Sequence, residues 1–583
     1  MPNSFQPWRA AGFALFLSTC LIGFTACDTS STTDESESTS SETVPAADSG
    51  ILKLLYWQAP TILNPHLSTG IKDAEASRIT LEPLASYDNE GNMVLFLAAE
   101  EPTLENGGLS EDGRTVTWKL KEDVLWSDGT PFTAADVVFT YEFLTNPEVG
   151  ATSASAYEVV ESVEALDDYT VQITFKEPNP AWFLVFMGPS GMMMPQHIYA
   201  DYNGANVREA PANLMPVGTG PYAVTEFKPG DVIVYEPNPN YRDPDSLAFE
   251  RVELKGGGDA ASAARAVMQT GDADFADNLQ VEAQVLEQFT GAGEVVAVFG
   301  PQMERILVNQ TDPNATTSDG ARSTLENPHP FLTDPQVREA LSLAIDRQTI
   351  SEQLYGPSGQ PTANVVLAPQ QFVSENTDYE FDLERAAELL DEAGWVDSND
   401  DGTRDKDGVE MQMVFQTSVN SVRQKTQEIV KQSLESIGIS VEIKSIDASI
   451  YFSGDPANDD TTEKFQADIQ MYTTGNSSPD PGDYLKTFTC SEIPQPDNNW
   501  VGYNAARYCN PEYDALWQES SVELDPDRRQ ELVLEMNDLL VEDAAVIPVV
   551  HRAETVGVGD RLQGINLTPW DQNTWNIAEW RKE

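Results

Sequence analysis

The stretch MQMVFQTSVNSVRQKTQEIVKQSLESIGISVEIK, Met411–Lys444, carries the clearest fold signal in the chain. Its first six residues, Met411–Gln416, have the apolar character of a strand, and apolar side chains then recur at helical spacing over Ser421–Ile437. Gly438 ends the helix, and Ile439–Lys444 is again rich in β-branched residues. A strand, a helix and a strand joined by so short a turn predict a parallel βαβ crossover, so we expect an α/β fold.

The same mixed pattern extends from this unit toward both ends of the chain. We expect further strands and helices, which are the strand Ile51–Trp57, a strand around Val116–Leu120, a capped helix from Thr133 to Phe143, a hairpin over Tyr222–Val234, a helix from Asp334 to Gly356, a helix Pro526–Asp543 and a strand Ala545–Val550. We find no internal repeat. The pattern predicts two α/β lobes, each with its own core.

Length and charge limit the possible classes of protein. The 583 residues are too many for one core and imply two or three domains. Against 95 Asp and Glu stand only 34 Lys and Arg, which gives a formal net charge of −61. Nucleic-acid binding needs a basic surface, so we exclude a nucleic-acid partner.

The amino-terminal segment predicts export and a lipid anchor. Arg9 precedes a short apolar run, Ala10–Phe24, and the small residues before Cys27 are typical of a signal cut in front of a lipidated cysteine. The run is too short to span a bilayer. We therefore expect a lipoprotein signal peptide over residues 1–26, with ordinary signal cleavage nearby as the alternative. Residues 27–50 are rich in Ser, Thr, Asp and Glu and are expected to form a disordered tether. The mature protein would then lie at the extracytoplasmic face of the cell membrane.

Two cysteines remain after this assignment. Cys490 and Cys509 lie 19 residues apart, in a compartment that permits disulfides, so we predict that they pair. By loop entropy such a bridge would contribute about 3 kcal/mol. Two cysteines without nearby histidines make a poor metal site.

Several segments, in order along the chain, resemble the peptide-binding family of extracytoplasmic solute-binding proteins, the receptors of ATP-driven importers. They are LEPLASYDNEG from Leu81, LSEDGRTVTWKLKEDVLWSDGTPFTAADVVFTYEF from Leu109, GTGPY from Gly218, NPNY from Asn238, DPQVREALSLAIDRQTISEQLYG from Asp334, SPDPGDYL from Ser478 and NPEYDALWQES from Asn510. Any one segment alone would be weak evidence. Their common order from about Leu54 to Ile547 is specific.

The resemblance implies a bilobed fold of the periplasmic-binding-protein type II kind, with an extra subdomain in the first lobe. We expect the first lobe over residues 51–300, with the inserted subdomain at about 85–210, the second lobe over 301–550, and a return to the first lobe over 551–583. The chain would cross between lobes near Gly300 and near His551. The implied function is to capture a short peptide in the interlobe cleft and deliver it to ABC permease subunits in the membrane. We expect a monomer that has no catalytic residues and needs no cofactor.

The resemblance also suggests where the ligand binds. Peptide receptors of this family often hold the ligand's amino group with an Asp four residues before the proline that matches Pro481, but that position here is Ser477. Asp480 is a possible substitute, with a turn-forming carboxylate as the alternative. Trp57 and Gln58 end the first strand, where open α/β sheets place ligand contacts. Tyr472, Asn476 and Trp500 are further candidates for the cleft, and ordinary core packing is the alternative for the aromatic residues.

One loop resembles the start of a calcium site. Asp397, Asn399, Asp401 and Asp405 alternate as in a calcium loop, but its twelfth position is Gly408 instead of a bidentate Glu. A solvated hairpin turn is the alternative. The four histidines, His66, His197, His329 and His551, show no metal-ligand spacing, so a nickel site is unsupported.

Three other functions stay open. The same receptor fold can serve a non-peptide solute such as an oligosaccharide or a metal chelate, and the serine at position 477 favours this alternative. A sensory receptor without transport is also compatible with the chain. A secreted hydrolase with a carboxylate pair has no support beyond the abundance of Asp and Glu.

Overall fold

The structure is a computed structural model that describes residues 50–583 except 57–58, 69, 257–258, 280 and 453–457. The described residues belong to one compact unit. Its central element is a mixed sheet of 11 strands. Ten strands follow one another in a single order, and β12 (Gly359–Pro361) pairs with β18 outside that order. The main order is β16 (Ser440–Ile446), β15 (Gln412–Ser418), β17 (Ile469–Thr474), β11 (Gly293–Val308), β18 (Val546–Gly559), β10 (Phe275–Ala276), β1 (Ile51–Tyr56), β9 (Arg251–Gly256), β8 (Val232–Pro237) and β7 (Tyr222–Lys228).

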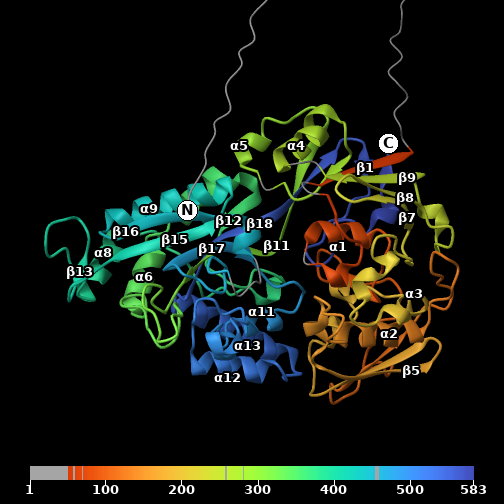
Figure 1. Ribbon diagram of the computed structural model, residues 1–583, viewed down its shortest axis with the longest axis horizontal. Helices are drawn as coiled ribbons and strands as arrows, with labels where there is room; N and C mark the ends of the chain where they lie inside the picture. Colours follow the sequence, from red (N-terminus) through yellow and green to blue (C-terminus); the bar gives the residue numbers. More distant parts are fainter. Residues whose placement is uncertain (1–49, 57–58, 69, 257–258, 280, 453–457) are drawn as a thin grey trace, which may run out of the picture. The chain divides into compact units, whose positions relative to one another are not determined.

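Two long antiparallel strands, β11 and β18, run through the middle of this sheet and connect its two halves (Figure 1). Their pairing is interrupted between Phe299 and Met303, and there the His551 ring nitrogen hydrogen-bonds to the Gly300 carbonyl at 2.7 Å. Gly300 and His551, where lobe crossings are predicted, both lie at this irregularity, and the crossings themselves stay a prediction. An interrupted ladder between two lobes is a natural place for a hinge, because fewer backbone bonds resist bending there.

The first half combines residues from both ends of the chain. Its core packs side chains of β1, β7, β8 and β9 against Val556, Leu562 and Trp580 from the end of the chain. Around it lie α1 (Ile71–Arg78), α4 (Ala260–Arg265), α5 (Ala283–Leu286) and the strand pair β19 (Leu562–Gln563) and β20 (Arg581–Lys582). The end of β18 and the residues that follow it therefore share a core with β1.

A separate core lies within the first half, and most of its residues lie between α1 and β7 in sequence, with Leu67 and Trp570 added from outside. It is built around buried aromatic residues such as Trp118, Trp126 and Phe143. Its elements are β2 (Ala85–Tyr87), β3 (Met93–Leu95), β4 (Thr115–Lys119), α2 (Ala134–Thr145), β5 (Val160–Asp167), β6 (Thr170–Phe175) and α3 (Gln196–Tyr199). Thr133 and Asp136 form the predicted capping box of α2.

The second half has two cores on the two sides of its part of the sheet. Its remaining elements are α6 (Pro335–Leu343), α7 (Arg347–Ile350), α8 (Leu383–Glu392), β13 (Asp405–Lys406), β14 (Val409–Glu410), α9 (Ser421–Ser436), α10 (Ala448–Tyr451), α11 (Gly482–Lys486), α12 (Pro511–Ser520) and α13 (Pro526–Glu542). The predicted βαβ unit is confirmed, because β15 and β16 pair in parallel and α9 connects them.

The prediction of a single helix from Asp334 to Gly356 is wrong, because the helix is interrupted between Leu343 and Arg347. Helix α6 ends at Leu343, and a new helix, α7, begins at Arg347. The cause is Asp346, whose carboxylate accepts a hydrogen bond from the Thr349 amide at 2.9 Å and caps the second helix. The strand expected over Ala545–Val550 is also longer than predicted, since β18 continues to Gly559.

Candidate ligand-binding site

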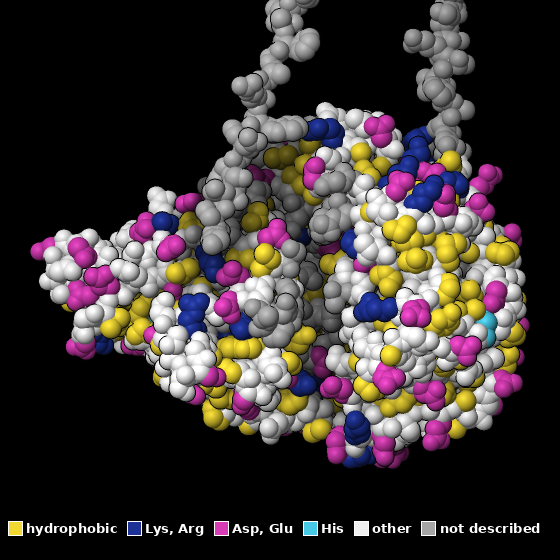
Figure 2. All heavy atoms as spheres, viewed as in Figure 1, with side chains coloured by type: hydrophobic (Ala, Val, Ile, Leu, Met, Phe, Trp, Pro, Cys, Tyr) yellow, Lys and Arg dark blue, Asp and Glu magenta, His cyan; other side chains and the backbone are white. Residues whose placement is uncertain are grey.

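A hollow of about 700 Å³ lies between the two lobes. Residues within 87–115 and 179–183 of the first lobe line one side, and residues within 369–372, 479–480 and 523–529 of the second lobe line the other. A smaller hollow of about 70 Å³ adjoins it, because both are lined by Tyr87 and Pro479. Figure 2 shows the furrow that separates the two lobes on this face. The volume lies within the range of small-molecule and cofactor pockets.

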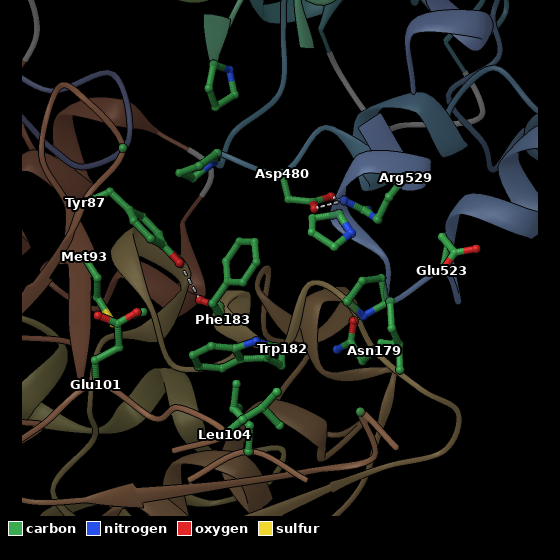
Figure 3. Close-up of a pocket in the computed structure, with 18 of the residues that line it drawn as sticks. Tyr87, Met93, Glu101, Leu104, Asn179, Trp182, Phe183, Asp480, Glu523 and Arg529 are labelled. Atoms are coloured by element: carbon green, nitrogen blue, oxygen red, sulfur yellow. Dashed lines mark hydrogen bonds and ion pairs between the residues drawn. The ribbon is translucent and has the colours of Figure 1, made fainter. Parts of the chain in front are cut away.

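The first-lobe wall is aromatic. Tyr87, at the end of β2, donates its hydroxyl hydrogen to the Phe183 carbonyl at 2.7 Å, and its ring meets the Phe183 ring edge to face (Figure 3). Trp182 packs edge to face on Phe183, with ring centroids 5.8 Å apart. Burial raises the pKa of Tyr87, and the carboxylates of Asp480 and Glu101 raise it further, so the hydroxyl keeps its proton. Such a wall offers flat apolar surface to a ligand.

The second-lobe wall carries a buried ion pair. Arg529, in the first turns of α13, donates to both carboxylate oxygens of Asp480, and the Nη2–Oδ1 distance is 2.9 Å (Figure 3). The exposed fractions are 3% for Asp480 and 7% for Arg529. Arg529 Nε also donates to the Ser520 carbonyl, and Asp480 accepts from the Gly482 amide. The charge of Asp480 is therefore compensated within the protein.

A group of buried carboxylates lies beside the end of β1. Asn573 donates from its backbone to Glu75 at 2.7 Å and from its side chain to Asp277 at 2.9 Å. The second oxygen of Asp277 has no hydrogen-bond partner. Burial raises the pKa of Asp277 to about 7, with a further contribution from the carboxylate of Glu554. Burial also raises the pKa of Glu75, and the carboxylate of Asp277 raises it further. At neutral pH this group therefore holds protons that free carboxylates would release.

The sequence comparisons place the chain in a known family. Residues 97–494 match the model described as bacterial extracellular solute-binding proteins, family 5 Middle. The chain belongs to this family. Family 5 proteins are extracytoplasmic receptors of ABC importers and not a family of enzymes. This family 5 protein is 26% identical over 537 residues to the oligopeptide-binding protein AppA of Bacillus subtilis, which covers 89% of each chain.

Solved structures of similar proteins confirm the bilobed α/β fold. The structure of NikZ from Campylobacter jejuni, in complex with Ni(L-His), matches with a TM-score of 0.74 and 23% identity over 92% of this chain and 100% of that one. The structure of AppA from Bacillus subtilis, in complex with a nonapeptide, matches with a TM-score of 0.71 and 24% identity over 92% of this chain and 99% of that one. At these identities the likeness establishes the fold alone.

Two of the predicted site residues of this family 5 protein line the interlobe space. Ser477 borders the smaller hollow, and Asp480 borders the larger one. Asp483 also lines the smaller hollow. Burial raises the pKa of Asp483, and the nearby carboxylate of Asp480 raises it further. Ligand contact by Ser477 and Asp480 stays a prediction. Trp57 and Gln58 lie outside the described residues, as do Cys27 and the predicted signal and tether.

The other three candidates lie elsewhere and have protein partners. The Tyr472 hydroxyl accepts from Arg305 at 3.2 Å, and the guanidinium lies over its ring. Asn476 donates to the carbonyls of Ala368 and Ser478, although its own carbonyl oxygen is buried without a partner. The ammonium of Lys464 lies 4.7 Å from the Trp500 ring centroid. None of these three candidates borders either hollow.

The possible calcium loop has the bonding pattern of a turn. The Asp397 carboxylate accepts from the amides of Asp401 and Gly402, and Asn399 accepts from the Asp401 amide. Asp405 accepts from Ser398 and begins the hairpin β13–β14. Among the described residues no group of three or more His, Cys, Asp or Glu side chains is placed to hold a metal ion. These contacts favour the alternative of a solvated turn.

The predicted disulfide is present. Cys490 and Cys509 are bonded, with their Cα atoms 4.6 Å apart. Cys490 follows Thr489 after α11, and Cys509 precedes α12, so the bridge closes the loop between these helices. Within the described part of the chain, none of the helices combines the length and apolar character needed to cross a membrane.

The sequence patterns did not identify Trp182, Phe183 or Arg529 as site residues. Trp182 and Phe183 stand together after Asn179-Pro180, in a segment without a clear helical or strand period, and this aromatic pair in an irregular segment was the available signal. Arg529 gave no signal of its own. It lies within the polar first turns of a helix, where an arginine is ordinary.

Proposed function

We propose that this chain is a lipid-anchored receptor that captures a short peptide between its lobes and delivers it to the permease subunits of an ABC importer. The observation that carries the proposal is the 700 Å³ space lined by both lobes. A ligand that contacts both lobes at once stabilises the closed form relative to the open one. The permease would then recognise the closed form.

The lining of this space suits a peptide. Aromatic surface on one wall can pack against peptide side chains of many shapes, whereas the polar atoms near it can bond to peptide backbone groups. The relative AppA is named as an oligopeptide-binding protein. The lipid anchor at Cys27 is part of the proposal on the strength of the signal-like segment before it.

A non-peptide solute is the second candidate. Ser477 replaces the Asp that often binds a peptide's amino group in the family, and the nearby Asp480 is already paired with Arg529. An amine anchor at this position would have to break a buried ion pair, which costs several kcal/mol. The solute would then be an oligosaccharide or a metal chelate.

Native mass spectrometry of the purified protein, expressed without residues 1–27, separates these candidates. A series of short peptide masses released on denaturation would support the peptide receptor and give the ligand length. A single non-peptide mass would contradict it and keep only the receptor mechanism.

A further inference from the structure

Carboxylates dominate the charged side chains that border the large interlobe space. Five carboxylates contribute to its lining and only one cation, Arg529. The carboxylates are those of Glu90, Glu101, Glu111, Asp480 and Glu523. Asp480 is neutralised by Arg529, which has no free charge left for a ligand. Among the described residues the four glutamates take part in no ion pair, so their charges stay available.

These glutamates stand on both walls. Glu90, Glu101 and Glu111 belong to the first lobe, and Glu523 precedes α13 in the second lobe. In Figure 3, Glu101 and Glu523 lie on opposite sides of the aromatic pair Trp182 and Phe183. Closure of the empty cleft brings like charges closer together, which opposes closure. A cation between them removes this repulsion and favours the closed form.

The aromatic pair between the carboxylates is suited to the stem of a long cationic side chain. Trp182 and Phe183 are half-buried, so part of each ring is open to the cleft. An aliphatic stem can lie on these rings while its charged end stays near a carboxylate. The face of a tryptophan ring also attracts an ammonium or guanidinium that approaches it.

The geometry points to a preference for basic peptides, with a lysine or arginine side chain on Trp182 and Phe183 and its charge between Glu101 and Glu523. This inference rests on the proposed function, since it names the class of peptide that the same cleft takes. It assigns the cation to these glutamates and not to Asp480, whose charge is already compensated.

Calorimetric titration with a matched set of peptides tests the preference. The probes are five-residue alanine peptides with lysine placed at each position in turn, and the same peptides with norleucine or glutamate in its place. Norleucine keeps the aliphatic stem and removes the charge. We expect the best lysine peptide to bind about tenfold more tightly than its norleucine analogue at low salt, and the ratio to fall at high salt. The glutamate peptide should bind most weakly.

The variant E101Q/E523Q tests whether the preference for lysine comes from these two glutamates or from the overall negative charge of the protein. It should bring the ratio of lysine to norleucine affinities close to one, and the norleucine peptide should bind at least as tightly as before, because the repulsion that opposes closure is removed. The matched control is E161Q/E164Q, which removes two exposed charges on β5 of the same lobe, where neither glutamate has an ion pair among the described residues. The control should keep the ratio.

Three outcomes would overturn the inference. Equal affinity for the lysine and norleucine peptides in the unaltered protein would leave the peptide receptor standing without the preference. A preference that survives in E101Q/E523Q, or that falls equally in the control variant, would assign it to another place. If no peptide of the set binds and none co-purifies, the proposed function falls together with the inference.

Discussion

Single residues decide how the cleft wall is held together, and the Asp480–Arg529 pair is the clearest case. Both side chains are at most 9% exposed, so each needs the other to remain charged inside the protein. Arg529→Met leaves a buried carboxylate without its partner and should lower the free energy of unfolding by about 3–5 kcal/mol. Asp480→Asn in the same chain removes that carboxylate and should restore a large part of the loss. Urea unfolding of the single and double variants measures both; a double variant no more stable than R529M would contradict the pairing.

The buried carboxylate Asp277 gives a pH-dependent prediction. Its pKa in the folded protein is about 7, above that of a free Asp, so the stability that its protonation supports is full at low pH and is lost as the pH rises through about 7. The variant D277N cannot ionise. It should be as stable as the unaltered protein near pH 4 and gain relative to it up to pH 8, by at most about 4 kcal/mol.

Melting curves of both proteins across this pH range measure the difference. Nearby Glu554 titrates in both proteins, so its contribution largely cancels in the comparison. Asp277 helps to raise the pKa of Glu75, so D277N also changes the titration of Glu75 and the measured difference belongs to this coupled pair. A difference in melting temperature that stays constant from pH 4 to pH 8 would contradict a raised pKa at Asp277.

At this scale the site could be predicted only in part. Asp480 was found because it lies in a segment that resembles the family, and Ser477 because it stands four residues before Pro481 of that segment. Both border the interlobe space. The rest of the lining comes from segments far apart in the chain, between residues 87 and 529. Periodicity reports which face of an element is buried, but it carries no information on which distant loops meet.

The individual helices and strands could be predicted better than the site. The βαβ unit and the α2 capping box depend on local signals, namely apolar periodicity, a glycine stop and a cap three residues from its partner. The break between α6 and α7 was missed because apolar residues continue across it. The capping carboxylate of Asp346 outweighs this continuity.

The disulfide acts at the level of the loop that it closes. Removal of the Cys490–Cys509 bridge frees the unfolded chain and should lower the stability by about 3 kcal/mol. Neither cysteine lines the interlobe space, so ligand affinity should change little. The melting temperature and the ligand affinity of C490S/C509S check both points. Equal melting temperatures with and without the bridge would remove its stabilising role.

The whole molecule is expected to be held at the membrane by one covalent anchor. Cys27→Ser removes the proposed lipid attachment and should move the protein from the membrane fraction to the soluble fraction after cell lysis. Immunoblotting of the two fractions measures this. Unchanged retention of the variant in washed membranes would refute the lipid tether.

At this largest scale the expected lobe crossings near Gly300 and His551 fall within β11 and β18, where the ladder between the two strands is interrupted. The family segments predicted two lobes, since those segments span nearly the whole chain. The position and lining of the cleft could not be predicted, because they depend on how residues within 87–183 pack opposite residues within 479–529. That packing is a sum of many contacts between residues distant in sequence.

Closure of the lobes on a peptide is the central claim, and a distance between the lobes tests it most directly. Spin labels at Glu105→Cys in the first lobe and Gln518→Cys in the second would occupy exposed positions. Pulsed electron paramagnetic resonance would compare protein stripped of ligand with the same protein saturated with a peptide identified by mass spectrometry. The account predicts a shorter and narrower distance distribution with peptide. An identical distribution in the two samples would contradict capture by closure.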